Sequence, residues 1–520
     1  MRSAVNEFAQ FLERKHYSKI KVHESSIIEK DRRIFFLIRE KLERKLVILI
    51  PQPPQVSLIS FVFEEKGDYV FQGEKYRVWI CPCNHENACA LRETFPFTKP
   101  KAIGLQPAIG TGDRIGLATP GHIKAAKELN VFPVLAQQSI REMDRTSRTP
   151  YDVLDDASWA VFQVGYKGGF AADADHLKTL RDIDITFKAG FTMYTIDPSD
   201  YVDNEAENYG LSTLREKFKK LPWDELEYET EQLVEEYLKQ RYEIRFPDGT
   251  RTFRFSEESL LRAAVKYSAA VAHAAKMYRY MKNLFGSREF DVEVSVDETK
   301  TPTSPLEHIF IVSELSRLGV KFTGLALRFV GRFEKAIDYI GDLREFEESF
   351  KTHVYIARTY GPYKLSIHSG SDKFSIYPIV GKIASEMIHL KTAGTSYLEA
   401  LRVVARHDPN LFREIVQYSF GRFEEDRRSY DVSTDLSVVP NPSDVPDDRL
   451  ETVFLDENNG RQLLHITYGS VLTAKKDTEE WLFRDRLKKL LIENEKEHYE
   501  TVYEHIKKHI RLLWAGDKKE

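Results

Sequence analysis

Ionisable side chains recur in this sequence at the points where short apolar runs end. Eight such runs occupy residues 102–113, 132–139, 169–176, 191–200, 290–299, 320–331, 363–371 and 387–396. The polar residues at their ends are Asp113, Gln138, Asp175 with His176, Asp197, Asp297 with Glu298, Arg328, His368 and Lys391. Burying charged groups without a function is costly, so their convergence from separate strands predicts an active site.

Alternation along two of the runs predicts which side chains point inward. In residues 291–298 the valines at every second position share one face, whereas Glu293, Ser295 and Asp297 share the other. We therefore expect Glu293 to project into the interior below Asp297. The same alternation in residues 364–368 turns Ser366 and His368 inward. A carboxylate in a valine-rich strand is seldom structural, which favours a functional role for Glu293.

Two further histidines need particular backbone geometry to reach the same place. Asp175 and His176 are adjacent, so both can face one site only where the strand gives way to a loop. His308 follows Ser304-Pro305-Leu306-Glu307, a capping box with proline at the first helical position. His308 should then lie in the first turn of a helix that begins on the catalytic side. Read alone, it is more typical of a surface or capping histidine.

Together, His176, His308 and His368 would match an open catalytic metal site with one position left for water or substrate. Neutral imidazoles suit Zn²⁺, Ni²⁺ or Co²⁺ better than Mg²⁺. No compact motif links the three residues, so spacing alone gives only weak support for the site.

Alternating strands and helices must position these residues. Eight strand units with polar carboxyl ends predict an α/β chain with a (β/α)₈ TIM-like barrel, and a doubly wound sheet is the rival architecture. We expect an N-terminal α/β extension over residues 1–100 and the barrel over 101–405, with a helical insertion at about 203–286. Residues 406–520 should form a helical region that packs on the barrel.

Composition excludes several classes of protein. The chain has 520 residues, 42% of them hydrophobic, with a net charge of -5, so nucleic-acid binding is not expected. Three cysteines exclude a disulfide scaffold, and no apolar segment is long enough to span a bilayer. We see no secretory signal and expect a cytoplasmic protein with a small-molecule substrate, for which a homo-oligomer is one expected state.

Three other motifs leave alternatives open. Cys81, Cys83, His85 and Cys89 could form a structural zinc site, although such sites usually take wider paired spacing. The glycines of residues 110–116 resemble a dinucleotide fingerprint, but the third is one residue late and no acidic strand end follows. The helix that begins at residues 393–396, with Lys391 nearby, could bind a substrate carboxylate or phosphate.

Several long stretches resemble the tagaturonate epimerases, which interconvert tagaturonate and fructuronate. They include GTGDRIGLATPGH (110–122), GFAADADH (169–176), EVSVDETKTPTSPLEHIF (293–310), IHSGSDKFS (367–375) and HLKTAGTSYLEALR (389–402). This resemblance implies a divalent metal cation (Zn, Ni, Co or Mn) bound by His176, His308 and His368. It further implies Asp175 as the proton acceptor and Glu293 as the proton donor.

Epimerisation at C4 limits the possible mechanisms, because the C4 hydrogen is not α to the C2 ketone. A retro-aldol and aldol sequence with a metal-stabilised enediolate would invert C4, and transient oxidation by a nicotinamide is the rival route. We expect Gln138, Arg328, Lys391 and Asp297 to bind the substrate. The alternatives are a two-carboxylate barrel glycoside hydrolase, another metal-dependent sugar isomerase, or a non-catalytic sugar-binding protein.

Overall fold

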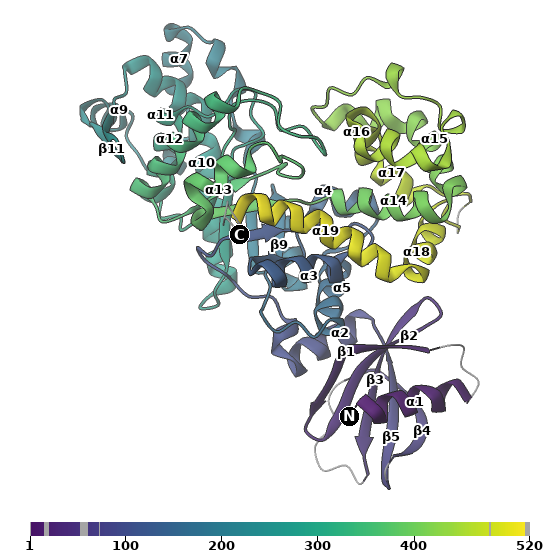
Figure 1. Cartoon of the computed structure of the whole chain (residues 1–520). Coiled ribbons are helices and arrows are strands. Elements are labelled where there is room, and N and C mark those ends of the chain that lie inside the picture. The colour runs from purple at the N-terminus through teal and green to yellow at the C-terminus, as the bar shows by residue number, and fades with distance from the viewer. Residues whose placement is uncertain (1, 15–19, 53–60, 72, 478–479, 515–520) are drawn as a thin grey trace.

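The centre of the molecule is a parallel sheet of nine strands, seen in a computed structural model (Figure 1). The structure describes residues 2–14, 20–52, 61–71, 73–477 and 480–514. The strand order of the nine-stranded sheet is β7-β6-β16-β15-β14-β13-β10-β9-β8. The strands are β6 (Ala108–Gly110), β7 (Phe132–Val134), β8 (Gln138–Ser139), β9 (Asp173–Leu177), β10 (Met193–Ile196), β13 (Asp291–Ser295), β14 (Gly324–Ala326), β15 (Lys364–Ile367) and β16 (Ile388–Lys391). Each of the eight predicted runs contributes strand residues to this sheet.

The two edges of the sheet come from one short stretch of chain. Strands β7 and β8 lie only three residues apart in the sequence, and β7 pairs with β6 while β8 pairs with β9. A parallel bridge between Val134 and Ala171 joins the two edges. The sheet therefore curls on itself, which is consistent with the predicted TIM-like barrel and not with an open, doubly wound sheet.

Four of the helices that follow the strands begin at a residue whose side chain caps them. Side chains of Ser139, Thr149, Thr179 and Ser304 accept hydrogen bonds from the backbone of the first helical turn in four capping boxes. The barrel helices are α3 (Thr119–Leu129), α4 (Ile140–Thr146), α5 (Pro150–Gln163), α6 (Leu180–Ala189), α11 (Pro305–Arg317), α12 (Leu343–Tyr360), α13 (Tyr377–Ala384) and α14 (Thr395–His407).

The segment between β10 and β13 is mostly helical but also contains a β-hairpin. Its helices are α7 (Leu211–Phe218), α8 (Trp223–Leu226), α9 (Thr230–Lys239) and α10 (Glu257–Phe285), and its hairpin pairs β11 (Tyr242–Phe246) with β12 (Gly249–Phe253). The long, alanine-rich α10 packs on α11, so it takes the place of the barrel helix after β10.

The first hundred residues form a separate antiparallel sheet with its own hydrophobic core. Its strands are β1 (Ile20–Lys30), β2 (Arg33–Glu40), β3 (Glu43–Pro51), β4 (Glu64–Phe71) and β5 (Glu74–Pro82), in the order β1-β2-β3-β5-β4. Helix α1 (Arg2–Arg14) covers one face, and α2 (His85–Thr94) leads towards the barrel and packs against α5 (Figure 1).

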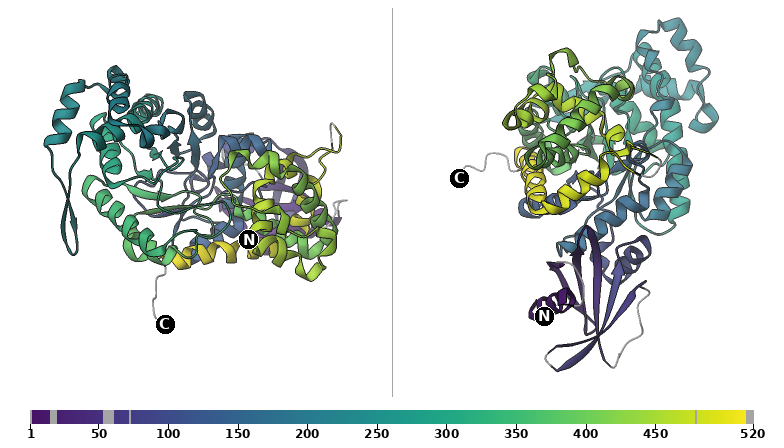
Figure 2. Two further views of the ribbon diagram at one scale, coloured as in Figure 1. Left: turned by 90° about the horizontal axis from the view of Figure 1, so that it is seen from above. Right: turned by 90° about the vertical axis from the view of Figure 1, so that its right-hand side faces the viewer.

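The described residues between 409 and 514 are mostly helical and pack on the barrel. Their helices are α15 (Pro409–Asp426), α16 (Asn458–Ile466), α17 (Tyr468–Thr473), α18 (Arg484–Glu493) and α19 (Glu495–Trp514). The last helix, α19, lies beside α3, α13 and α14 (Figure 2). Among the described residues, no helix combines the length and apolarity needed to cross a membrane.

Candidate active site

A cavity opens at the carboxyl ends of the barrel strands, beside the C-terminal helices. Its main part has a volume of about 510 Å³, and it continues into a recess of about 60 Å³. The residues that line both parts are Arg141, His176, Lys335, His368, Ser369 and Tyr430. The Tyr430 side chain comes from the segment after α15, so the C-terminal region completes the wall of the cavity. This is the end of a barrel where active sites are found.

Lys391 stands at the floor of the recess and joins three carboxylates from two strands, β9 and β13. Its Nζ lies 2.7 Å from Asp175 Oδ1, 2.8 Å from Glu293 Oε1 and 2.9 Å from Asp173 Oδ2. It also donates a hydrogen bond to Thr195 Oγ1 at 2.7 Å. Burial lowers the pKa of Lys391, but the three carboxylates outweigh burial and raise the pKa well above its ordinary value. The amino group of Lys391 is therefore protonated in the resting site.

A β-bulge lets Asp175 and His176 serve the same site. In the pairing of β9 with β10, Tyr194 is opposite Ala174 but Ile196 is opposite Leu177, so the register shifts at Asp175 and His176. His176 has a φ of 51°, in the left-handed region that a histidine seldom adopts. Both side chains line the recess as a result. The regular strand geometry is therefore interrupted at these two residues by a bulge within β9, and not by the loop that the sequence analysis named, and the interruption lets both side chains face one site.

His176 and His368 face each other, and each is held by a carboxylate. Their ring centroids are 5.0 Å apart. His176 Nδ1 lies 3.1 Å from Asp197 Oδ2, and His368 Nδ1 lies 3.1 Å from Asp297 Oδ1. Burial lowers the pKa of both rings, but neighbouring carboxylates, Asp175 for His176 and Asp297 for His368, raise them to about 9 and about 10. The carboxylates therefore favour the protonated, positively charged form of both imidazoles.

Glu293 lies beneath the floor of the cavity and is fully buried. Its Oε1 is 2.7 Å from His368 Nε2, its Oε2 is 3.2 Å from His389 Nδ1, and it accepts a hydrogen bond from Ser366. Burial raises the pKa of Glu293, but Lys391 and His368 lower it well below its ordinary value. The inward orientation predicted from alternation is confirmed, although Glu293 reaches the cavity only through its neighbours.

Asp175, in contrast, lines the recess directly. Its Oδ1 contacts Lys391 and its Oδ2 accepts a hydrogen bond from Gln137 Nε2 at 2.8 Å. Burial raises the pKa of this carboxyl, but Lys391, His176 and His368 lower it below its ordinary value. Asp175 is therefore an ionised carboxylate that could accept a proton from a bound molecule.

The residues fit a divalent cation through a mixed nitrogen and oxygen donor set. Ligand atoms of His176, Asp197 and Glu298 lie within 4.8 Å of one another, and His368 is next to His176. Both imidazoles are oriented through Nδ1 by a carboxylate, an arrangement common at metal-binding histidines. Asp173, Asp175 and Glu293 contact the ammonium group of Lys391, and Asp197 and Asp297 contact the two imidazoles.

The structure does not bring His308 to the other two histidines. His308 is fully buried on α11, with Nδ1 at 3.0 Å from His353 Nδ1 and Nε2 at 2.8 Å from Tyr363 Oη. Its ring packs between α11 and α12 instead of turning to the mouth of the barrel, because the first turn of α11 presents this position to α12. His308 therefore does not line the cavity and is not placed to bind an ion there.

Of the four predicted substrate-binding residues, Lys391 lines the recess, and Asp297 and Arg328 line the main cavity. Gln138 does not: it is fully buried, and its neighbour Gln137 lines the recess instead. Residues 135–137, between β7 and β8, are not in strand geometry. The side-chain alternation of one continuous strand therefore does not extend to Gln138. Sequence reasoning also missed the cavity-lining Arg141, Lys335 and Tyr430, which lie on helices and loops outside the strand ends.

In the structure, the residues of the other three motifs pack against or bond to other parts of the protein. Cys81 is buried in the N-terminal sheet and Cys89 is exposed, and among the described residues the group with Cys83 and His85 does not bring three ligand atoms within 4.8 Å. Asp113 accepts hydrogen bonds from several backbone N–H groups between residues 115 and 119 and so orders the start of α3. Ser396, in the first turn of α14, is bonded to His122 Nε2 at 2.7 Å.

Comparison with known proteins assigns the chain to a family. A family model described as tagaturonate epimerase matches residues 23–513. The chain is 47% identical over 492 residues to the tagaturonate/fructuronate epimerase of Thermotoga maritima, covering 95% of this chain and 96% of that protein. A glycerol complex of fructuronate-tagaturonate epimerase from Cohnella laeviribosi superposes with a TM-score of 0.87 at 38% identity, covering 98% of this chain and 99% of that one. The native structure of that enzyme gives a TM-score of 0.86. With this agreement in sequence and fold, the chain belongs to the tagaturonate epimerase family.

Proposed function

We propose that this chain inverts C4 of a ketouronate, converting tagaturonate to fructuronate by retro-aldol and aldol chemistry. The observation that carries the proposal is the contact of Asp175 and Glu293 with one ammonium group, Lys391 Nζ, beside two carboxylate-oriented imidazoles. An acid–base pair and a cation site at one end of a barrel are what bond cleavage next to a ketone requires.

His176 and His368 are the residues that would hold a divalent metal, with a nearby carboxylate such as Glu298 completing the set. Asp197 and Asp297 would keep both rings oriented through Nδ1. When bound, such an ion would supply Lewis-acid polarisation of the substrate ketone and its neighbouring hydroxyl, and the donor set suits Zn, Ni, Co or Mn. We leave His308 out of this set because it packs between α11 and α12 and does not line the cavity.

Asp175 would take the proton of the C4 hydroxyl as the C3–C4 bond breaks. The electron pair of that bond passes to C3 and the ketone, which gives an enediolate fragment and an aldehyde fragment that carries the C6 carboxylate. Rotation about C4–C5 presents the other face of the aldehyde, and C3 attacks it to reform the bond with C4 inverted. The new alkoxide regains a proton from the opposite side.

Glu293 is ionised in the resting site, so it would act as the proton donor after taking up a proton, and it would pass that proton through Lys391 because it does not line the cavity. Lys391 Nζ is within hydrogen-bond distance of both carboxylates, so a proton donated from one side of the site can be replaced from the other. Asp175 and Glu293 would exchange their roles in the reverse reaction.

Basic side chains in the main cavity would hold the C6 carboxylate while the aldehyde turns. Arg141, Arg328 and Lys335 all line this part of the cavity. Arg141 lies 3.7 Å from Glu298 Oε1, whereas Lys335 Nζ donates a hydrogen bond to Ser369 Oγ at 2.7 Å. Anchoring the carboxylate would prevent loss of the fragment between bond cleavage and re-addition, and would favour uronates over neutral ketoses.

Incubation with tagaturonate deuterated at C4 tests the reaction and the route together. We expect fructuronate, identified by NMR, with the deuterium retained because the C4–H bond is never broken. Asp175→Asn should lose the activity, whereas the matched control Asp200→Asn, at an exposed ion pair with Lys178, should keep it. Loss of deuterium to solvent would refute the retro-aldol route, and absence of fructuronate would refute the function.

A further inference from the structure

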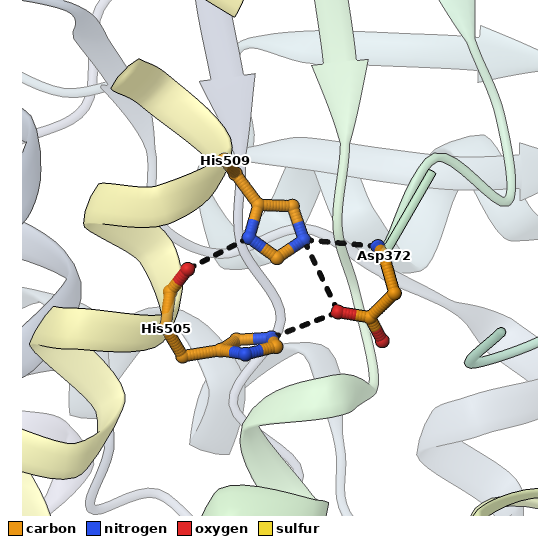
Figure 3. Close-up of side chains that lie close together, drawn as sticks. All are labelled: Asp372, His505 and His509. Carbon is orange, nitrogen blue, oxygen red and sulfur yellow. Dashed lines mark hydrogen bonds and ion pairs between the residues drawn. The ribbon is translucent and has the colours of Figure 1, made fainter. Parts of the chain in front are cut away.

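Three potential metal ligands lie together outside the catalytic cavity. Asp372 follows β15, and His505 and His509 are separated by one turn on α19 (Figure 3). Asp372 Oδ1 is 3.5 Å from the Nε2 atom of each histidine. Asp372 lies only four positions after His368 in the sequence. Its carboxylate nevertheless turns towards α19 and the cavity on that side of the barrel.

Both rings turn Nε2 towards Asp372 Oδ1, and each Nε2 also has a hydrogen-bond partner that an ion would have to displace. His509 Nδ1 donates to the carbonyl oxygen of His505 at 2.8 Å, so Nε2 carries a lone pair, which accepts the Asp372 N–H at 3.0 Å (Figure 3). His505 Nδ1 lies 3.5 Å from Glu399 Oε1, and its Nε2 is 3.0 Å from Thr395 Oγ1. A carbonyl or carboxylate on the outer nitrogen is the usual setting of a metal-binding histidine.

Asp372 is the second, independent sign of a ligand. Its side chain is 4% exposed, and Oδ2 is paired with Arg461 at 2.8 Å. Within the described part of the chain, Oδ1 is buried and has no hydrogen-bond partner. The residue has a φ of 62°, in the left-handed region that aspartate adopts more readily than most residues. A buried carboxylate oxygen that accepts no hydrogen bond and faces two imidazoles is a potential metal ligand.

The separations match those of a four-coordinate ion. Ligands that bind zinc at about 2.0–2.1 Å in a tetrahedron lie about 3.4 Å apart, close to the 3.5 Å found between Oδ1 and each Nε2. Asp372 and His505 also line a surface cavity of about 650 Å³, which leaves room for a water molecule as the fourth ligand. The ion would take the place of the Asp372 N–H at His509 Nε2, which requires a small turn of that peptide.

We propose that Asp372, His505 and His509 form a second divalent-metal site, of the zinc, cobalt or nickel class, distinct from the catalytic cavity. Two imidazoles and one carboxylate suit these ions better than Mg²⁺ or Ca²⁺. The ion ties α19 to the loop after β15, whose Ser369 and Ser371 line the catalytic recess. The site therefore fastens the last helix of the chain to the loop that carries catalytic side chains, whatever substrate the cavity accepts.

Cobalt titration of the chelator-treated, full-length enzyme tests the proposal, with bound Co²⁺ counted after dialysis. We expect His505→Gln/His509→Gln to bind one equivalent less than the wild-type chain and to lose the absorption bands of low-coordinate Co²⁺ at this site. The matched control His407→Gln removes a partly exposed histidine that pairs with Glu497 and should bind as the wild type does. His176→Gln/His368→Gln should lose a different equivalent, so failure of the catalytic metal proposal is distinguishable.

Unchanged cobalt stoichiometry in His505→Gln/His509→Gln would overturn the second site. If that variant does not fold, wild-type crystals soaked in zinc give the answer through an anomalous-difference map. A peak between Asp372, His505 and His509 supports the proposal, and a map without density there overturns it.

Discussion

Within the described part of the chain, replacing Lys391 with methionine removes the only ammonium group in contact with Asp173, Asp175 and Glu293. The contacts of 2.7–2.9 Å are almost completely buried, with Asp173 and Glu293 0% exposed, so water compensates poorly for the lost cation. Removing one partner of a buried ion pair costs about 3–5 kcal/mol, because the remaining charge is left uncompensated. We expect the free energy of unfolding to fall by about this amount near pH 7.

The destabilisation should depend on pH in a defined direction. In the wild-type chain the folded-state pKa values of Asp175 and Glu293 are lowered, so their stabilisation is present above about pH 4 and is lost as the pH falls further. Without Lys391, burial makes the folded chain bind protons more readily than the unfolded chain, and the variant should gain stability as the pH falls. The difference between the two proteins should therefore shrink from about pH 7 towards about pH 4.

Urea denaturation at a series of pH values, in chelator, measures this difference. Lys178→Met is the matched control: it breaks an exposed pair with Asp200 at 2.6 Å and should cost about 0–1 kcal/mol at every pH. Adding Asp173→Asn to Lys391→Met should recover part of the loss, because one uncompensated charge disappears. A Lys391→Met chain as stable as the wild type, or a loss that does not vary with pH, would refute the reasoning.

Three further outcomes can be measured by kinetics. Gln137→Leu should lower kcat about 10-fold, since one hydrogen bond to the Asp175 carboxylate is worth about 1.5 kcal/mol. Gln138→Leu should leave kcat close to that of the wild type. Equal effects of the two substitutions would contradict the assignment of Gln137 to the site. Arg328→Gln should raise KM for tagaturonate about 10-fold or more, with the exposed Arg251→Gln as control, and an unchanged KM would remove Arg328 from the carboxylate site. EDTA should abolish turnover and Zn, Co, Ni or Mn should restore it in the wild type but not in His368→Gln; full activity in EDTA would refute a catalytic metal.

Strand positions could be predicted because the local pattern is determined by local geometry. Each barrel strand is a short apolar run that ends at a polar residue, and alternation along β13 was enough to turn Glu293 inward towards Ser366 and His389. Capping boxes likewise set the starts of the helices that follow. These features depend on residues within a few positions of one another, so one sequence contains them.

The site errors come from contacts between residues far apart in the chain. His308 was placed near the mouth from its position in a helix, but its orientation depends on His353 and Tyr363, which lie 45 and 55 residues away. Gln138 was taken as the polar end of its run, and the irregular backbone between β7 and β8 has no signature in residue types. The carboxylate partners of His176 and His368 could have been inferred, since Asp197 and Asp297 were both recognised as strand ends.

The bulge at Asp175 and His176 explains why strain is located here. A regular strand would send one of the two side chains out towards the helices, so a site that needs both must break the alternation. A histidine at a φ of 51° costs of order 1 kcal/mol, and the carboxylate of Asp197 offsets part of that cost by holding the ring at Nδ1. The same bond orients the ring so that Nε2 faces the space shared with His368. The strained backbone and the carboxylate therefore act together: one brings the imidazole to the cavity, and the other selects the nitrogen that it presents there.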